Sequence, residues 1–248
     1  MKFSVLTYNL LYHRAAKQLK EVFWEHGPDL LFFQEMITSD HELKLIEKMG
    51  YRLADFSNSF IRSGQIFGVA TFYNPKIFKA VSSRSFDLPY GFFEALLFLL
   101  KKGEVPRTVL ETQLELKESK KKITIYNIHL SAVAMNTIRQ RQILNTFREL
   151  KLEKKTPVII AGDFNYPYNR RDFEELIKEY NLKEATRNLS FTSNFLKLSP
   201  LKLKLDYILY KNLMLIETQR VNIKLSDHYP IISTFSLKQK DKNTSSLG

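Results

Sequence analysis

The string Ser226-Asp227-His228-Tyr229-Pro230 lies near the end of the 248-residue chain and places an acid beside an imidazole just before an apolar run. Polar residues recur upstream in the same way, each at the end of a short segment rich in Val, Ile, Leu, Phe or Tyr. These positions are Asn9, Gln34-Glu35, Asn127-Ile128-His129, Gly162-Asp163-Phe164-Asn165 and Leu205-Asp206-Tyr207. A parallel or mixed sheet would bring such strand ends to one rim. The pattern therefore predicts one site assembled from most of the chain.

The composition predicts a single domain with a substantial core. Hydrophobic residues make up 44% of the chain, which is ample at this length. Proline and glycine number only 8 each, and no Ser/Gly-rich or Pro-rich spacer separates the polar landmarks. We therefore expect one domain over residues 1–237. Residues 238–248 are polar and rich in lysine, and we expect them to be a disordered tail.

The chain has no cysteine, which excludes disulfides, thiolate zinc sites and a cysteine nucleophile. Any metal must be held by oxygen or imidazole. The most apolar stretch, residues 92–100, contains Glu94 and is far shorter than the roughly 20 apolar residues of a membrane span. Asn9 and His13 interrupt the apolar N-terminal segment, which argues against a signal peptide. We therefore expect a cytoplasmic protein without a transmembrane segment.

Lysine and arginine outnumber aspartate and glutamate by 38 to 26, which gives a formal net charge of +12. This excess favours a polyanionic partner, either nucleic acid (DNA or RNA) or an anionic lipid surface. A surface that is merely basic is the alternative. The positive residues are spread over residues 117–122, 151–155 and 197–204, so the sequence does not define a single patch.

The first elements predict a crossover unit. Residues 3–8 suit a buried strand, residues 14–26 a helix, and residues 29–33 a second strand. A strand–helix–strand unit of this length places its two strands parallel, so Asn9 and Glu35 should reach the same edge of the sheet.

The rest of the chain alternates between strands and helices. Further strands are expected at residues 51–54, 66–73, 79–86, 107–116, 122–130, 157–161, 205–210, 213–221 and 229–236, and further helices at 41–49, 135–150 and 172–180. Because crossovers and hairpins both occur, the pattern favours an α/β layered sandwich with mixed sheets.

Two positions carry carboxylates suited to phosphate chemistry. Glu35 follows the apolar run 30–33, with Gln34 between, where burial is costly unless a cation such as Mg²⁺ compensates, with Asn9 nearby. Gly162 permits a tight exit from its strand, after which Asp163 and Asn165 point the same way. Such an Asp can deprotonate water, and the amide can hold a phosphate oxygen. Taken singly, a charged strand end and a turn explain these residues equally well.

His129 and His228 are two of five histidines, and both fall where a strand meets a loop. Histidine can stabilise charge on a phosphoryl oxygen when a carboxylate keeps it oriented and protonated. Asp206 is the candidate for that orienting role. A lone histidine at such a place is more typical of a structural residue, so each assignment is weak alone.

The ordered set is more specific than its members. Asn9, Gln34-Glu35, His129, Gly162-Asp163-Phe164-Asn165, Asp206 and Ser226-Asp227-His228 resemble, in this order, the endonuclease/exonuclease/phosphatase superfamily of DNase I-like, metal-dependent phosphoesterases. The resemblance runs from residue 3 to about residue 237. It implies a four-layer α/β/β/α sandwich of two mixed sheets, with the site at one end.

The resemblance also implies roles for individual residues. The metal ligands, for Mg²⁺ or Mn²⁺, would be Glu35, Asn9 and Asp227. The catalytic groups would be Asp163, which aligns the nucleophilic water, and Asn165, His228, Asp206 and His129 around the phosphate. Substrate contacts would come from Asn9, Asn165 and Arg107. The implied reaction is in-line attack of water on phosphorus without a covalent intermediate.

Departures from the pattern separate the subfamilies. Leu11 and His129 stand where apurinic-site endonucleases usually carry Asp and Tyr, and Lys204-Leu205-Asp206-Tyr207 replaces the Trp-Cys-Asp string of inositol polyphosphate 5-phosphatases. DNase-like nucleases, deadenylase-like exonucleases and sphingomyelinase-like phosphodiesterases remain. The positive charge favours nucleic acid, whose bases could stack on the tyrosines near the rim, namely Tyr12, Tyr166 and Tyr168. Partial burial of these rings at the edge of a sheet is an equally good interpretation.

A phospholipid or inositol-phosphate esterase of the same superfamily is the alternative. It rests on residues 92–100, which are followed by Lys101 and Lys102 and could dip into a bilayer interface. A catalytically inactive binding module is disfavoured, because every acid, amide and imidazole of the pattern is present. The sequence leaves open DNA or RNA, endo or exo action, one or two metals, and the oligomeric state.

Overall fold

A computed structural model describes residues 1–87, 108–130, 136–150, 152–166, 169–194, 201–223 and 225–237, with no side chains described for residue 87 or for residues 136–139. Several features named above lie outside these ranges. They are Arg107, Tyr168, the apolar stretch 92–100 and the tail 238–248.

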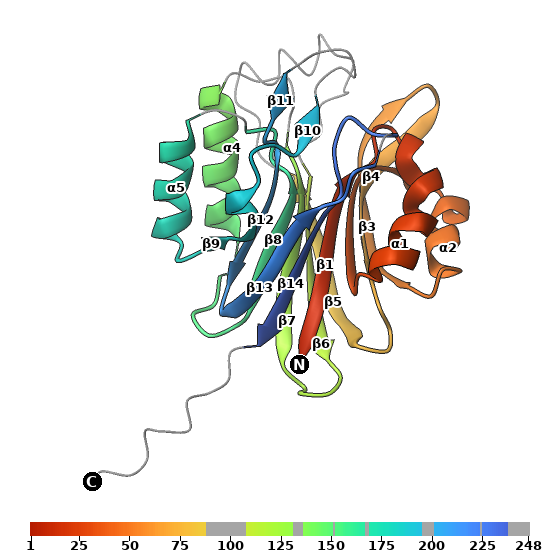
Figure 1. The fold of residues 1–248 in the computed structure, drawn as a ribbon, viewed down its shortest axis with the longest axis horizontal. Helices are drawn as coiled ribbons and strands as arrows, with labels where there is room; N and C mark the ends of the chain where they lie inside the picture. Colours follow the sequence, from red (N-terminus) through yellow and green to blue (C-terminus); the bar gives the residue numbers. More distant parts are fainter. Residues whose placement is uncertain are drawn as a thin grey trace.

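The first sheet contains six strands in the order β13-β14-β1-β2-β4-β3 (Figure 1). Their bounds are β1 Lys2–Asn9, β2 Leu30–Ile37, β3 Arg52–Arg62, β4 Gln65–Tyr73, β13 Leu213–Arg220 and β14 Ile231–Leu237. The 3₁₀ helix η1 (Arg14–Gln18) and helix α1 (Leu19–His26) connect β1 to β2, and α2 (Asp40–Glu47) follows β2. β1 and β2 pair in parallel and the other neighbours pair antiparallel, so the predicted crossover and the mixed sheet are confirmed.

The second sheet also contains six strands, in the order β5-β6-β7-β8-β12-β9. Their bounds are β5 Phe78–Asp87, β6 Thr108–Leu116, β7 Lys122–His129, β8 Val158–Asp163, β9 Lys183–Glu184 and β12 Asp206–Lys211. Helix α4 (Asn136–Glu149) joins the parallel pair β7 and β8, and α5 (Arg170–Glu179) follows β8. The 3₁₀ helix η2 (Ala185–Asn188) and the short hairpin of β10 (Ser193–Asn194) and β11 (Lys202–Leu203) complete the described elements.

The layers follow the predicted α/β/β/α order. Figure 1 shows α1 and α2 on the outer face of the first sheet and α4 and α5 on the outer face of the second. The four-layer sandwich with two mixed sheets is therefore confirmed. Among the helices in the described part of the chain, none is long and apolar enough to cross a membrane.

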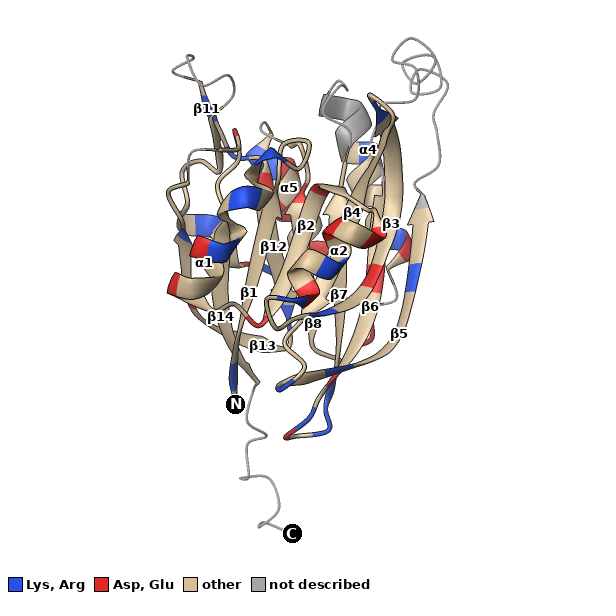
Figure 2. Cartoon of the chain, turned by 90° about the vertical axis from the view of Figure 1, so that its right-hand side faces the viewer, with Lys and Arg blue, Asp and Glu red and all other residues tan. Residues whose placement is uncertain are grey.

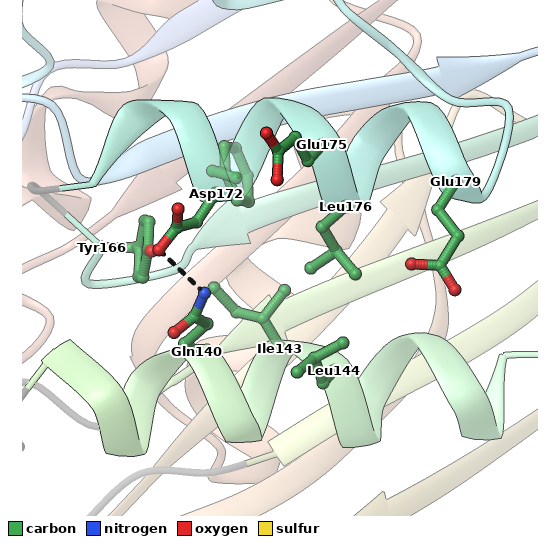
Figure 3. Close-up of a pocket in the computed structure, with 9 residues that line it drawn as sticks. Gln140, Ile143, Leu144, Tyr166, Asp172, Glu175, Leu176 and Glu179 are labelled. Atoms are coloured by element: carbon green, nitrogen blue, oxygen red, sulfur yellow. Dashed lines mark hydrogen bonds between the residues drawn. The ribbon is translucent and has the colours of Figure 1, made fainter.

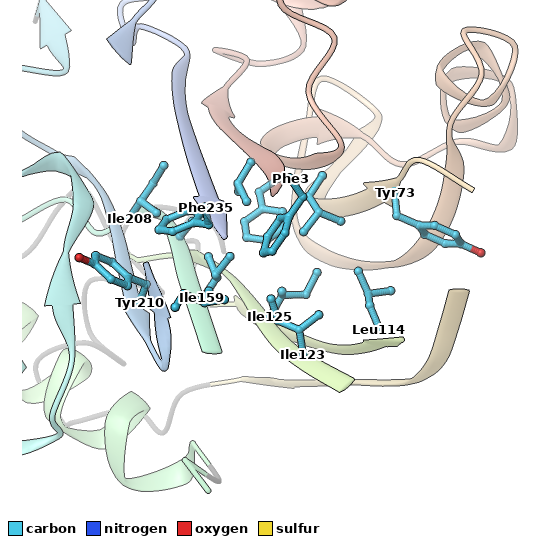
Figure 4. Close-up of a cluster of buried hydrophobic side chains, with 14 of the residues drawn as sticks. Phe3, Tyr73, Leu114, Ile123, Ile125, Ile159, Ile208, Tyr210 and Phe235 are labelled. Atoms are coloured by element: carbon cyan, nitrogen blue, oxygen red, sulfur yellow. The ribbon is translucent and has the colours of Figure 1, made fainter. Parts of the chain in front are cut away.

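Strand β1 explains why the core has separate compartments. Phe3 and Val5 belong to the cluster between the two sheets (Figure 4), whereas Leu6 and Tyr8 pack with α1 and α2 on the outer face. Successive strand residues point to opposite faces, so a strand that is covered on both sides must be apolar nearly throughout. Each buried side chain of this size contributes about 1.5–3 kcal/mol.

Strand β3 is the main element whose prediction was wrong. The sequence predicted a strand at residues 51–54 only, yet β3 extends to Arg62. Asp55, Ser57 and Asn58 interrupt the apolar pattern, and the pairing with β4 shifts register twice, between Leu53 and Asp55 and between Asn58 and Phe60. Bulges break strict alternation, which removes the signal on which the prediction rests.

Candidate active site

Three of the predicted site residues align across the second sheet. His129 ends β7, Asp163 ends β8 and Asp206 begins β12. The register pairs His129 with Asp163 and Asp163 with Asp206. Residues paired across neighbouring strands point to the same face, so these three side chains project together. Strand pairing alone thus assembles residues that are 77 positions apart in the sequence, from 129 to 206.

Gly162 allows β8 to carry Asp163 to this point. Its φ is +145°, and an added Cβ would lie 1.9 Å from the carbonyl oxygen of Ile128 on β7. Only glycine permits that approach between the two backbones. The predicted tight exit from the strand is therefore also a close contact with the neighbouring strand.

The first sheet contributes Asn9 and Glu35. Asn9 ends β1, and Glu35 lies in a bulge of β2 where the pairing with β4 shifts between Phe33 and Met36. Glu35 has a left-handed φ of +52°, a conformation that costs a non-glycine residue about 1–3 kcal/mol. A bulge re-aims a side chain that regular pleating would direct elsewhere.

Two buried amides, one from each sheet, support this bulge. The Nδ2 of Asn127 on β7 donates to the carbonyl oxygens of Phe33 (3.2 Å) and Ala70 (3.0 Å). Gln34 Nε2 donates to Asn127 Oδ1 at 2.7 Å. Backbone carbonyls beside the interrupted ladder therefore find donors across the interface between the sheets. The sequence contained the signal, since amides interrupt two apolar strands, but no role was assigned to either residue.

Asn9 links the carboxylates of the two sheets. Its Nδ2 donates to Glu35 Oε1 at 3.3 Å and to Asp163 Oδ2 at 3.0 Å. The backbone N–H of Tyr12 donates to Glu35 Oε2 at 2.8 Å. Residues 11–13 are all left-handed, with φ between 48° and 65°, which turns that amide towards the carboxylate. The two predicted acids thus share one amide, although they belong to different sheets.

His228 is held by a carboxylate, as predicted for Asp206. Its Nδ1 lies 2.8 Å from Asp206 Oδ2, and its Nε2 lies 3.7 Å from Asp163 Oδ2. Burial disfavours the imidazolium, but the charges of Asp206 and Asp163 outweigh it and raise the pKa of His228 well above its ordinary value. The two carboxylates thus favour the charged form of His228.

Two hydroxyls missed by the sequence analysis fix this arrangement. Thr192 Oγ1 accepts from the backbone N–H groups of Leu205 and Asp206, both at 2.9 Å, and donates to Asp206 Oδ2 at 2.8 Å. Ser226 Oγ donates to the carbonyl of Asn9 at 2.8 Å and accepts from the N–H of His228 at 3.0 Å. Ser226 stands in the string that drew attention first, whereas nothing in the sequence around Thr192 indicates its role.

Asp163 and Glu35 are acids whose charged forms are disfavoured. Burial raises the pKa of Asp163 to about 7, against the opposing effect of His228. Burial also raises the pKa of Glu35 above its ordinary value, although the Tyr12 N–H opposes the change. A cation near these two groups would offset their desolvation.

His129 differs from His228 in charge. It is 1% exposed, and its Nε2 lies 3.8 Å from both Glu35 Oε1 and Asp163 Oδ2, beyond hydrogen-bond distance. Burial, and then repulsion by His228, lower its pKa to about 3. The imidazole of His129 is thus neutral at neutral pH, a distinction that strand position alone does not reveal.

We expect His129→Gln to flatten the acid side of the stability profile of the metal-free protein. The unfolded chain binds a proton near pH 6.5, whereas folded His129 resists it down to about pH 3, so wild-type stability is lost as pH falls through this window. One proton corresponds to a slope of about 1.4 kcal/mol per pH unit. Urea unfolding in EDTA between pH 6 and 4 measures the two slopes. Parallel curves that differ only by a constant offset would report a packing effect alone and would contradict the buried neutral state of His129.

The remaining predicted residues lie nearby or outside the described ranges. The backbone N–H of Asn165 donates to Asp163 Oδ1 at 2.9 Å. The side-chain Nδ2 of Asn165 donates one of its two hydrogens to the carbonyl of Leu130 at 2.8 Å, and the second hydrogen does not take part in that bond. Asp227 Oδ1 lies 4.0 Å from His228 Nε2. Arg107 lies outside the residues that the structure describes.

Two tyrosines at the rim are less open to bases than predicted. Tyr166 is only 2% exposed and packs on Phe173, so a base cannot stack on it. The ring of Tyr12 carries the guanidinium of Arg62, whose Cζ is 3.9 Å from the centroid. For Tyr166, therefore, burial rather than exposure at the rim is the correct interpretation, because its ring packs against α5 through Phe173.

A groove between α4 and α5 is separate from this cluster (Figure 3). Its volume is about 410 Å³, and Gln140 Nε2 donates across it to Asp172 Oδ2 at 3.1 Å. It lies on the outer face of the second sheet and contains none of the predicted site residues. Its lining residues are Gln140, Ile143, Leu144, Tyr166, Asp172, Phe173, Glu175, Leu176 and Glu179.

The family model for the Endonuclease/Exonuclease/phosphatase family matches residues 6–228. The chain belongs to the endonuclease/exonuclease/phosphatase family. The resemblance inferred from the ordered polar residues is thereby confirmed, and with it membership of a superfamily of metal-dependent phosphoesterases.

Solved structures of this family share the fold. The human Nocturnin catalytic domain with bound sulfate anion superposes with a TM-score of 0.79 at 22% identity, over 96% of this chain and 95% of that one. D. rerio TDP2 complexed with single strand DNA product gives 0.70 at 16% identity, over 95% and 99%. A Bacteroides thetaiotaomicron mannosyl-6-phosphatase gives 0.70 at 18% identity, over 95% and 100%.

Curated relatives are the UPF0294 proteins. That of Vibrio parahaemolyticus is 24% identical over 135 residues, which are 54% of this chain and 46% of the relative. That of Erwinia tasmaniensis is 25% identical over 238 residues, 95% of this chain and 82% of the relative. The alignment thus spans about half the length of the Vibrio relative.

Proposed function

We propose that this family member is a divalent-metal-dependent phosphodiesterase that hydrolyses nucleic acid. The observation that carries the proposal is the convergence of groups from both sheets. Asn9 donates to Glu35 and Asp163 together, while His228, held by Asp206, lies 3.7 Å from Asp163. Buried acids, a neutral amide and one imidazolium are the groups that phosphoryl transfer to water requires.

The residues fit a hard divalent cation, and we propose Mg²⁺, with Mn²⁺ as a substitute. Glu35 would be the principal ligand, assisted by Asp227, because these side chains offer oxygen. Asn9 would join them through its Oδ1 after its amide turned over, since that oxygen now accepts from the Leu11 N–H at 3.0 Å while Nδ2 faces Glu35. When bound, the metal would neutralise charge on phosphate oxygens.

A second set of acidic and imidazole groups suits a metal less well. The ligating atoms of Asp163, Asp206 and His228 lie within 4.8 Å of one another. However, Asp206 Oδ2 already accepts from Thr192 and faces His228 Nδ1, and the carboxylates favour the charged imidazolium over the neutral ligand. His228 itself therefore supplies the positive charge in this set.

The protein groups divide the proton transfers. Asp163, whose pKa is about 7, would take a proton from the attacking water as the new O–P bond forms. The bond from phosphorus to the leaving oxygen breaks in the same step, and the departing alkoxide takes up a proton from solvent. His228 would stabilise the growing negative charge as an imidazolium. Neutral His129 and the remaining amide N–H of Asn165 would donate to phosphate oxygens. No covalent enzyme intermediate is involved.

Nucleic acid is favoured over other phosphate esters by charge. The chain carries +12, and backbone phosphates neutralised by lysine and arginine supply affinity that does not depend on sequence. The positive residues are nonetheless distributed (Figure 2), and the turn at residues 117–121 lies at the end opposite the site. The solved TDP2 complex, which contains a single-stranded DNA product, supports this substrate class.

A substrate panel tests the proposal. With Mg²⁺, we expect turnover of plasmid DNA, single-stranded DNA or RNA, and of bis(p-nitrophenyl) phosphate, with loss of all activity in EDTA. Sphingomyelin, phosphatidylinositol phosphates and sugar phosphomonoesters belong in the same panel. Turnover of a lipid or a phosphomonoester, with none of any nucleic acid, would replace nuclease with the corresponding esterase.

A further inference from the structure

A cation is fixed between two aromatic rings beside the catalytic cluster. Arg220 ends β13, and its Cζ lies 3.8 Å from the ring centroid of Phe191 and 4.7 Å from that of Tyr229. The two rings meet edge to face at 5.7 Å and 75°. Stacking on aromatic faces holds a guanidinium in place while leaving its in-plane N–H groups available.

A second cation shares one of these rings. The Nζ of Lys202, on β11, lies 4.7 Å from the centroid of Phe191. Among the described residues, no carboxylate forms an ion pair with Lys202 or Arg220. The sequence from 185 to 205 contains no acidic residue at all, but has Arg187, Lys197, Lys202 and Lys204. Two like charges on one ring, without a counter-ion in the described part of the chain, favour an added anion.

Arg220 also has an unused buried donor. Its Nη1 donates to the carbonyl of Phe191 at 3.4 Å, whereas its Nε is buried and has no acceptor among the residues that the structure describes. A buried N–H without an acceptor costs about 1–3 kcal/mol. Arg220 as a whole is only partly buried, so a phosphate oxygen would meet its remaining guanidinium N–H groups, which bind phosphate effectively.

The position of this cluster relates it to the site. Phe191 precedes Thr192, which binds Asp206, and Tyr229 follows His228. The two segments pair directly, with the N–H of Tyr229 donating to the carbonyl of Thr192 at 2.8 Å. Each ring residue is thus the immediate chain neighbour of a residue of the site, so the ring cluster lies on the flank of the catalytic groups. Figure 2 shows β11 projecting from the end of the sandwich, with Lys or Arg colour at its base.

We propose that Arg220 and Lys202 form a second phosphate subsite, which binds the backbone of a single nucleic-acid strand next to its scissile phosphate. This inference rests on the proposed function and extends it from a phosphodiester to a polymer. A small diester fits the catalytic cluster but does not reach the flank, whereas a strand carries a phosphate at every nucleotide. The subsite distinguishes long substrates from short ones without contributing to bond cleavage.

The test measures strand binding apart from turnover. The variants are Arg220→Met, Lys202→Met and the double variant, which keep most of the side-chain volume, with Lys211→Met as the control. Lys211 lies at the far end of β12 from Asp206. The probe is a fluorescein-labelled single-stranded 12-mer in EDTA, titrated by anisotropy over a series of salt concentrations.

We expect Arg220→Met to weaken binding by about tenfold, the loss of one charged hydrogen bond. The slope of log Kd against log salt concentration should fall by about 0.7 for each single variant, because each loses one phosphate contact with a single strand. The slope of the double variant should fall by about twice that amount. Hydrolysis of bis(p-nitrophenyl) phosphate in Mg²⁺ should be unchanged in all four variants, and Lys211→Met should retain the wild-type slope.

The outcomes separate this inference from the proposed function. Replacing Arg220 could loosen the packing of the Phe191 and Tyr229 rings. If Arg220→Met unfolds at a lower temperature than wild type, the salt dependence of binding in Lys202→Met, which leaves the Arg220 contacts in place, is the deciding measurement. A wild-type slope in Lys202→Met, with bis(p-nitrophenyl) phosphate still hydrolysed, overturns the subsite and leaves the phosphodiesterase. Reduced slopes in a protein that hydrolyses no diester would sink the catalytic proposal and retain the subsite. An equal loss of affinity and of salt dependence in Lys211→Met would show that only the net charge of the protein matters, and would overturn the subsite.

Discussion

Asp163→Asn should lower the rate of phosphodiester hydrolysis by about 10²- to 10⁴-fold, the range expected for loss of a general base. Asparagine is nearly isosteric and can still accept the N–H of Asn165, but it cannot take a proton from water. It would also place an amide nitrogen against Asn9 Nδ2, where Asp163 Oδ2 now accepts at 3.0 Å. The expected signature in steady-state kinetics is a fall in kcat much larger than any change in KM.

Stability distinguishes this result from simple damage to the fold. Burial raises the pKa of Asp163 because the charged carboxylate is poorly solvated, and a neutral amide avoids that penalty. The free energy of unfolding of the metal-free variant should therefore stay within about 1 kcal/mol of wild type. That difference corresponds to the loss of one hydrogen bond, the one from Asn9. Asp172→Asn on α5 is the control, because it removes a carboxylate whose hydrogen-bond donor, within the described part of the chain, is Gln140 in the separate groove. Full activity in Asp163→Asn would remove this residue from the role of base.

The position of the functional residues at strand ends was predictable, because each lies where an apolar run begins or ends. Asn9, His129, Asp163 and Asp206 all stand at strand termini, and a crossover unit requires its two strands to be parallel. Which strands become neighbours is not encoded in any one segment. The strand order within each sheet and the alignment of β7, β8 and β12 could not be predicted, because they depend on packing across the whole chain.

Other features of the site depend on contacts that a linear pattern does not contain. The bulge that turns Glu35 is stabilised by Asn127 from the opposite sheet, 92 residues away in the sequence. The different charges of His129 and His228 depend on burial and on which imidazole meets a carboxylate. Thr192 lies in an ordinary polar stretch, and its role exists only because β12 begins beside it. Local sequence thus indicates candidate groups, while tertiary contacts determine the protonation state and the orientation of their side chains.

Glu35→Gln should remove most of the effect of divalent metal on the protein. If Glu35 is the principal ligand, replacing its charge with a neutral amide should weaken Mg²⁺ binding by about 100-fold or more. At a metal concentration of 100 times the wild-type Kd, binding stabilises the folded wild type by about 2.7 kcal/mol, whereas the same concentration would stabilise the variant by only about 0.4 kcal/mol. Urea unfolding with and without Mg²⁺ measures both values without relying on turnover.

The metal-free state provides the complementary observation for Glu35. Its pKa is raised by burial, so removing its charge should leave the metal-free protein at least as stable as wild type, even though the introduced glutamine must adopt the same left-handed φ. Glu111→Gln is the matched control, because Glu111 is also buried but pairs with Arg84, 2.7 Å away, rather than with the site. That control should retain the full Mg²⁺ stabilisation. Equal stabilisation of wild type and Glu35→Gln by Mg²⁺ would move the metal to other ligands, with Asp163 and Asp206 the next to be replaced.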